Sequence, residues 1–377
     1  MSLLRNLVKN TVVLTAGRLS AKILGAVLVA FLARAVGPVG VGKYAFAGSL
    51  VAIFMLLPDF GFDTLLVRDV ARLRGQGEGL IANILGSKLV LSVVALLLMF
   101  IFAGVKQYDG KTVEILVLVF LSGVVGSILR TLYSVVRSFE RMEFEALLIV
   151  FRNVMLVVFG LTAIKLGLRL RGIIAALAVA DILAFLFGVY ITRRNFVRVA
   201  PKVDLSAVKK IFKAALPFGL LVIIEVVFIN TDNLMIARFQ GEMAVGWYSA
   251  AVKLLTMLLL IPHMFMNAIF PVLSRLSVSD GDSLRTAYTK SFSYLLMVAF
   301  PIGVGGFLVS DQVILFIYGD QFQNSILIFQ VMIWVVVFSF VGFLNGATLN
   351  ATGRERPFAL MQGVSALSNV FLDYFLI

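Results

Sequence analysis

The chain alternates long apolar runs with short polar connections along its whole length. Most runs extend over about twenty residues, the length that a helix needs to cross roughly 30 Å of hydrocarbon. Backbone groups in lipid must bond within their own segment, so these runs predict helices rather than isolated strands. The pattern therefore predicts an all-α, polytopic membrane protein. Eleven spans are expected, at residues 11–33, 45–67, 80–104, 113–136, 146–168, 172–192, 214–237, 247–271, 290–310, 325–349 and 358–377.

Composition narrows the functional class. Hydrophobic residues make up 61% and charged residues 14% of the chain, against about 45–50% and 25% in soluble proteins. The chain has no Cys and one His, which excludes disulfides, thiolate ligands and multi-His metal centres. It also contains neither G-x4-G-K-[ST] nor HExxH, so we expect no nucleotide-driven engine, no cofactor and no enzyme. No soluble stretch is long enough to present a basic face to nucleic acid.

The basic excess instead indicates membrane orientation. If the N-terminus is cytoplasmic, the cytoplasmic flanks and loops hold twenty Lys and Arg residues and the outer connections hold eight. Four of the twenty fall in residues 68–88 and seven in residues 193–213. We expect a plasma-membrane protein with a cytoplasmic N-terminus. The seven-charge loop predicts the seam between a six-helix lobe (1–200) and a five-helix lobe (201–377).

An internal repeat supports two lobes. Residues 33–58 (ARAVGPVGVGKYAFAGSLVAIFMLLP) align without a gap on residues 237–262 (ARFQGEMAVGWYSAAVKLLTMLLLIP), with ten identities in 26 positions. Six expected spans separate the copies, so both have the same orientation, as in a parallel repeat around an axis along the membrane normal. We expect a central cleft between the lobes and a second lobe that lacks a twelfth helix. Glycine and proline pairs shared by the copies predict loop geometry and helix kinks: Gly37/Gly241, Gly42/Gly246 and Pro58/Pro262.

Several motifs carry a family resemblance: the frame G-x3-V-G-x-Y-x2-A, PDFGFDTLLVRDVAR, LPFGLLVIIEVVFINTDNLMIARFQG, YGDQF and NATGRERP. Together they resemble the multidrug/oligosaccharidyl-lipid/polysaccharide flippase superfamily, and most closely its polysaccharide (O-antigen, Wzx-type) exporters. The resemblance extends over essentially the whole chain. It implies twelve to fourteen helices, so eleven is a departure. It also implies that cations in the central cleft hold a lipid-linked diphosphate.

The first expected helix carries two candidate substrate ligands, Arg18 and Lys22. Their i, i+4 spacing places both on one face, and neither has a charged counterpart in the second repeat copy. A diphosphate needs charge-assisted donors in a low-dielectric setting. The alternative is an ion pair between Lys22 and Glu225, which gates the passage or joins the lobes. Lys253 is a weaker third cation.

Depth separates the charges that need a partner from those that do not. At 1.5 Å per residue, Arg18, Arg130 and Arg152 lie within about 10 Å of the cytoplasmic face, so their side chains can reach the interface. Asp181, like Lys22 and Glu225, lies roughly 13–16 Å deep and cannot.

A coupling-ion site is expected from Asp232, Asn369 and Asp373. They lie at similar depths, and Asn369 and Asp373 share a helix face. Carboxylate and amide oxygens suit Na⁺, and a carboxyl group of raised pKa could instead carry a proton. Some lipid-flipping relatives place a monovalent-cation site between these two helices. The alternative is two outward-facing polar residues near the interface.

A gate is a further hypothesis. Asp59 and Asp63 are also spaced i, i+4, and the repeat places His263 and Asn267 at the matching positions. The alternative is pairing of the two Asp with Arg68 or Arg72 at the membrane edge.

Together these features favour a flippase that moves a polyprenyl-diphosphate-linked oligosaccharide by alternating access, with Na⁺ or H⁺ coupling. Expected partners are the lipid-linked substrate, membrane lipids, and glycan polymerases or glycosyltransferases of the same pathway. Two alternatives stay open. A cation-coupled drug antiporter would need acidic residues where Arg18 and Lys22 stand. An integral membrane glycosyltransferase or polymerase would need a sizeable outer loop.

Overall fold

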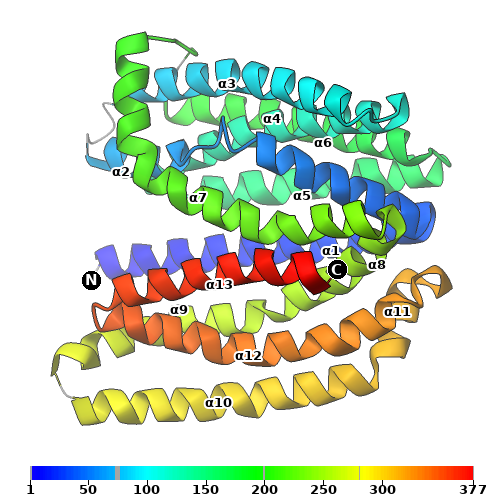
Figure 1. The fold of residues 1–377 in the computed structure, drawn as a ribbon. Coiled ribbons are helices and arrows are strands. Elements are labelled where there is room, and N and C mark those ends of the chain that lie inside the picture. Colours follow the sequence, from blue (N-terminus) through cyan, green and yellow to red (C-terminus); the bar gives the residue numbers. More distant parts are fainter. Residues whose placement is uncertain (1, 73–76, 198–199, 280, 377) are drawn as a thin grey trace. The chain divides into compact units, whose positions relative to one another are not determined.

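The computed structural model describes residues 2–72, 77–197, 200–279 and 281–376, with the side chains of residues 2–13 and of a few later positions left out. The described chain is helical throughout (Figure 1). Its helices are α1 (Ser2–Phe54), α2 (Phe62–Arg72), α3 (Glu78–Val105), α4 (Gly110–Ser138), α5 (Met142–Lys165), α6 (Leu170–Asn195), α7 (Leu205–Phe239), α8 (Glu242–Leu258), α9 (Leu260–Ser279), α10 (Gly281–Leu308), α11 (Ser310–Tyr318), the short 3-10 turn η1 (Asp320–Phe322), α12 (Ser325–Ala351) and α13 (Glu355–Leu376).

The all-α, multi-pass architecture is confirmed, with a different number of spans. Among the described residues, nine helical segments are long and apolar enough to cross a membrane. The first, residues 14–54, combines the first expected span with the start of the second. The two helical parts of α1 meet at Gly37, whose φ of 67° and ψ of −179° are not helical. The last expected span, 358–377, corresponds to α13, which is not among the nine.

The second half of the expected span 45–67 is broken rather than continuous. Helix α1 ends at Phe54, and α2 starts at Phe62. Pro58 has no N–H to continue the helix, and Gly61 has φ of 70°, a backbone conformation that L side chains rarely adopt. The expected kink at Pro58 is therefore a break. At the matching place in the second copy, α8 ends at Leu258 and α9 begins at Leu260.

Contacts among the helices divide the chain into two units. The first comprises residues 1–36 and 43–234, and the second residues 37–42 and 235–377. In the first unit, α4, α5 and α6 pack tightly together, and α2 and α3 pack against α4. In the second, α12 packs against α8, α9 and α10 (Figure 1). The expected lobe boundary at residue 200 stays a prediction.

Residues 201–204, which precede α7, form hydrogen bonds with the start of α3. The Lys202 N–H donates to the Ala82 carbonyl at 3.0 Å, and the Asp204 N–H donates to the Asn83 side-chain oxygen at 2.9 Å. Asp204 in turn accepts the Ser206 N–H at 2.9 Å, which satisfies one of the open donors at the start of α7. Hydrogen bonding to Ser206 lowers the pKa of Asp204. The polar connection is thus built into the first unit.

The paired glycines of the repeat adopt matching conformations. Gly37 has φ 67° and ψ −179°, and Gly241 has φ 86° and ψ 174°, a region essentially reserved for glycine. Within the second unit the segment 37–42 packs on the start of α8, so that a Cβ on Gly246 would lie 1.9 Å from the Pro38 carbonyl oxygen. The reciprocal is also true, because a Cβ on Gly42 would lie 1.6 Å from the Glu242 oxygen. Glycine is required at both positions by the close backbone approach.

Replacing Gly246 by Ala should separate these backbones. We expect destabilisation of about 1–3 kcal/mol, the usual cost of overpacking, measured as a lower thermal midpoint of the purified protein in detergent. Gly48→Ala in α1 is the control, since nothing lies within 4 Å of its added Cβ. Equal midpoints for the two variants would contradict the close approach.

Candidate substrate-binding cavity

Two adjoining hollows lie inside the first unit. One has a volume of about 570 Å³ and the other about 400 Å³. They share lining residues from α2, α4 and α5, namely Asp63, Gly126, Arg130 and Arg152, and so form one polar cavity. Helix α1 and helix α7 complete its wall through Arg18 and Glu225.

One face of α4 supplies most of this wall. Gly123 and Gly126 line the cavity and leave room where larger side chains would fill it. Arg130, Ser134 and Arg137 continue the same face at spacings of three and four residues. A single helix face thus carries both the open space and two guanidinium groups.

Behind the cavity wall, Lys88 of α3 pairs with two lining carboxylates. Its own side chain is fully buried. Its ammonium lies 2.9 Å from Asp59 Oδ1 and 3.0 Å from both carboxylate oxygens of Asp63. The Ser127 hydroxyl is 3.2 Å away, and the Thr131 hydroxyl donates to Asp63 at 2.7 Å. A buried ammonium is tolerated only when paired and hydrogen-bonded, and this set provides both.

Asp59 links the buried lysine to the cavity. Its second oxygen, Oδ2, accepts a hydrogen bond from Arg130 Nη2 at 2.5 Å. The Arg130 side chain is 52% exposed, whereas that of Asp59 is 17% exposed. The Asp59 carboxylate therefore binds the buried Lys88 through one oxygen and Arg130 through the other. The Arg130 guanidinium faces the cavity.

Two further carboxylates anchor arginines in the same way. Arg152 Nε lies 2.7 Å from Oδ1 of Asp181, a buried residue of α6 that also accepts the Ser122 hydroxyl. The buried Glu145 accepts Arg18 Nη2 at 3.2 Å and Arg137 Nε at 2.9 Å. Arg18 and Arg137 are 53% and 35% exposed.

The cavity exposes more positive than negative groups, although its wall contains both. Each anchored pair buries its carboxylate more deeply than its guanidinium. Glu225 is the exposed acid of the wall. The groups that a solute meets are mainly arginines, which present several N–H donors in a fixed plane and bind phosphate or carboxylate bidentately.

Four of the residues selected from the sequence meet in this cavity: Arg18, Asp59, Asp63 and Glu225. Lys22 lies one turn after Arg18 and is exposed. In the described part of the chain, no salt bridge joins Lys22 to Glu225, so the ion pair considered as the alternative is not formed in this structure.

The alternative pairing of Asp59 and Asp63 with Arg68 or Arg72 is wrong in the described structure. Arg68 pairs with its neighbour Asp69 at 2.6 Å, while both carboxylates turn to Lys88. Lys88 was counted among the cytoplasmic loop cations, but it lies inside α3 and contributes nothing to the surface charge.

The expected snorkelling of Arg130 and Arg152 is also replaced by ion pairs inside the cavity. The sequence does contain a usable signal for Arg130, since it shares a helix face with Gly123, Gly126 and Ser134. Glu145 carries no comparable signal, because its partners lie on two other helices.

The remaining selected residues lie elsewhere. Lys253 is exposed on α8, and the His263 ring on α9 lies 4.2 Å from the Phe343 ring. Asp232 is half-buried near the end of α7. The Asn369 side-chain oxygen is buried and has no hydrogen-bond partner among the described residues, and the side chain of Asp373 lies outside them. The coupling-ion set stays a prediction.

Comparison with known proteins decides the family. The sequence profile described as "Polysaccharide biosynthesis protein" matches residues 7–277, and the MatE profile matches residues 217–375. The chain belongs to the polysaccharide biosynthesis protein family. This membership agrees with the resemblance seen in its motifs.

Three bacterial proteins are similar to this chain, one along most of its length and two along about a third of it. A putative O-antigen transporter of Shigella flexneri is 23% identical, with 92% of this chain and 85% of that protein aligned. The teichuronic acid biosynthesis protein TuaB of Bacillus subtilis is 28% identical over 33% of this chain and 26% of its own length. The lipopolysaccharide biosynthesis protein WzxC of Escherichia coli is 26% identical over 33% of this chain and 25% of its own length.

Solved structures share the fold of this family member. The MATE multidrug transporter DinF-BH superposes with a TM-score of 0.63 at 16% identity, covering 95% of this chain and 85% of that one. An inward-facing MATE transporter of the MOP superfamily gives a TM-score of 0.60 at 17% identity, covering 96% and 84%. These similarities establish a MATE-like helical fold.

Removing the buried Lys88 ammonium should destabilise the first unit. In Lys88→Met, the two carboxylates lose their shared partner, and we expect a loss of about 3–5 kcal/mol, as when one member of a buried pair is removed. The measurement is the thermal midpoint in detergent. Lys111→Met, at an exposed position of α4, is the control. Adding Asp63→Asn to Lys88→Met should recover part of the loss, and no recovery would contradict the pairing.

Proposed function

We propose that this chain is a flippase that moves a polyprenyl-diphosphate-linked oligosaccharide from the inner to the outer leaflet of the plasma membrane by alternating access. The arginine-lined cavity of the first unit is the observation that carries the proposal. In this account its N-terminus is cytoplasmic. Once the buried Lys88 is left out, nineteen Lys and Arg residues lie on that side against eight on the other.

The exposed guanidinium groups suit a diphosphate. Arg18 and Arg130 are about half exposed, and each is held by a carboxylate rather than buried under it. A diphosphate that enters can replace or share that carboxylate, because guanidinium groups bind phosphate in the same bidentate geometry. Arg137 and Arg152 supply further donors along the same wall. The sugar would cross through the polar space, and the prenyl chain would stay in the bilayer.

The names of the relatives support the same substrate class. The aligned proteins are named for O-antigen transport and for teichuronic acid and lipopolysaccharide biosynthesis. Glycan polymerases and glycosyltransferases of the same pathway would then be its working partners. Lys22 and Lys253 are further phosphate contacts in this proposal. Asp232, Asn369 and Asp373 are its site for coupling to Na⁺ or H⁺, while Glu225 and His263 belong to its gate.

A cation-coupled drug antiporter is the second candidate, favoured by the MATE-like fold. The cavity argues against it, since a cationic drug would meet guanidinium groups at close range, and like charges in a desolvated site repel strongly. The two functions therefore differ in a measurable way.

Arg130→Ala combined with Arg152→Ala should reduce glycan export roughly tenfold or more, since each charge-assisted hydrogen bond is worth about 1.5–3 kcal/mol and 1.4 kcal/mol is tenfold. Surface glycan is measured in cells whose own copy of the gene is replaced, with membrane protein level held equal. Arg171→Ala is the matched control, because its ion pair with Glu114 is exposed and lies outside the cavity.

The same cells distinguish the two functions. Drug susceptibility should be unchanged by the double substitution, while surface glycan falls. If glycan were unchanged and susceptibility to cationic drugs rose, the antiporter would be supported and the flippase contradicted.

A further inference from the structure

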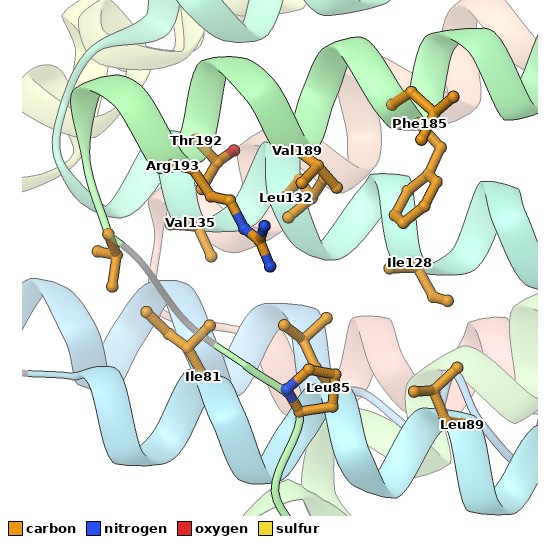
Figure 2. Close-up of a pocket in the computed structure, with 13 residues that line it drawn as sticks. Ile81, Leu85, Leu89, Ile128, Leu132, Val135, Phe185, Val189, Thr192 and Arg193 are labelled. Atoms are coloured by element: carbon orange, nitrogen blue, oxygen red, sulfur yellow. The ribbon is translucent and has the colours of Figure 1, made fainter.

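A second, apolar pocket lies in the first unit between α3, α4 and α6, near the end of α6. Its volume is about 240 Å³, below the range of about 300–1,000 Å³ that holds a whole drug-sized ligand. Aliphatic and aromatic side chains make up nearly all of its wall, and Figure 2 shows Phe185 and Val189 of α6 facing Ile128 and Leu89. The pocket therefore suits part of an apolar chain.

Two polar groups stand at one end of this apolar wall, and both lack partners among the described residues. Arg193 lies in the last turn of α6, and Figure 2 shows its guanidinium reaching toward Leu85 on α3. It makes no salt bridge or hydrogen bond with another described residue. The neighbouring Thr192 is 6% exposed, and its hydroxyl has no hydrogen-bond partner in the described structure. Buried hydroxyls normally have one, so this group is available to a ligand.

The position of these groups fits a lipid headgroup. The last turn of a membrane-spanning helix lies at the level of the headgroups, where anionic lipids attract Lys and Arg. Leu89 and Leu186 of the pocket wall are 40% and 55% exposed, so the pocket is open on a side where apolar side chains would contact lipid. A phosphate at Arg193 and Thr192 would direct its acyl chain between α3 and α6.

The pocket is separate from the diphosphate cavity. On α4, Ile128, Leu132 and Val135 line the pocket, with the i, i+4, i+7 spacing of one helix face. Arg130 and Arg137 line the polar cavity and lie on the opposite face of the same helix. One lipid cannot place its phosphate against both faces, so the occupant of the pocket differs from a substrate held in the cavity.

We infer that this pocket binds an anionic glycerophospholipid of the surrounding membrane, with one acyl chain between α3 and α6 and its phosphate at Arg193 and Thr192. The cation, the unbonded hydroxyl and the apolar wall together select a lipid that has a phosphate headgroup of net negative charge and a hydrocarbon chain. Such a lipid would be a resident component of the first unit.

The test is native mass spectrometry of the full chain, purified in detergent and titrated with phosphatidylglycerol. We expect one phosphatidylglycerol to bind at low concentration and phosphatidylcholine to bind at least about tenfold more weakly. Both lipids carry an anionic phosphate, but the quaternary ammonium of phosphatidylcholine cancels the headgroup charge and repels the Arg193 guanidinium. Inorganic phosphate should not displace the lipid, since it lacks the chain that fills the pocket. Equal binding of the two lipids would overturn the assignment.

A pair of neighbouring arginines provides the control. Arg193→Gln should weaken phosphatidylglycerol binding about tenfold, the effect of losing one charge-assisted hydrogen bond. Arg194→Gln should leave it unchanged, because Arg194 is already engaged with the Tyr190 hydroxyl and ring. An equal loss in both variants would show only a general attraction to positive charge and would overturn the site.

A second pair tests the apolar part. Leu186→Trp should block the pocket and remove the bound lipid, whereas Leu97→Trp, at a similarly exposed position of α3 outside the pocket, should not. Displacement of phosphatidylglycerol by undecaprenyl phosphate at equal concentration would instead assign the pocket to a prenyl chain and overturn the inference.

Discussion

Charge pairing inside the helical bundle is the constraint on which the rest of the first unit depends. A charge near the centre of a membrane span costs about 2.5–3.5 kcal/mol on insertion scales, so such charges normally pair or face a polar cavity. Lys88 is fully buried and is balanced by Asp59 and Asp63 together. This fixed centre joins α2, α3 and α4, and through Asp59 it also holds Arg130 in place.

The same ion pairing explains why the cavity exposes positive groups although its arginines are paired with carboxylates. Acids such as Glu145 and Asp181 are buried against the bundle, and their arginines extend into the open space. Preorganised guanidinium groups lose little entropy when an anion arrives. Helix α4 separates this polar function from an apolar one, since its opposite face carries the leucine and isoleucine side chains of the second pocket. One helix thus serves both the path of a charged headgroup and the attachment of a lipid.

The sequence predicted the helices well, because hydrophobic length determines where a chain crosses a membrane, and it predicted the shared glycine geometry through the repeat. It also selected Arg18, Asp59, Asp63 and Glu225, which do meet in one cavity. It did not predict their partners. Depth along a helix gives a height but not the neighbouring helix, so Lys88 was assigned to a loop, and Glu145 and Asp181 were not recognised as anchors. The kink expected at Pro58 proved to be a break between Phe54 and Phe62, which a single proline does not predict.

The central claim is that the exposed arginines carry a lipid-linked diphosphate across the membrane. Its most direct test is translocation of a fluorescent polyprenyl-diphosphate oligosaccharide in proteoliposomes that contain the purified chain, followed by quenching from the outside. The account predicts protein-dependent movement of this lipid and much slower movement of a polyprenyl glycoside that lacks the diphosphate. Equal rates for the two lipids, or movement of neither, would contradict it.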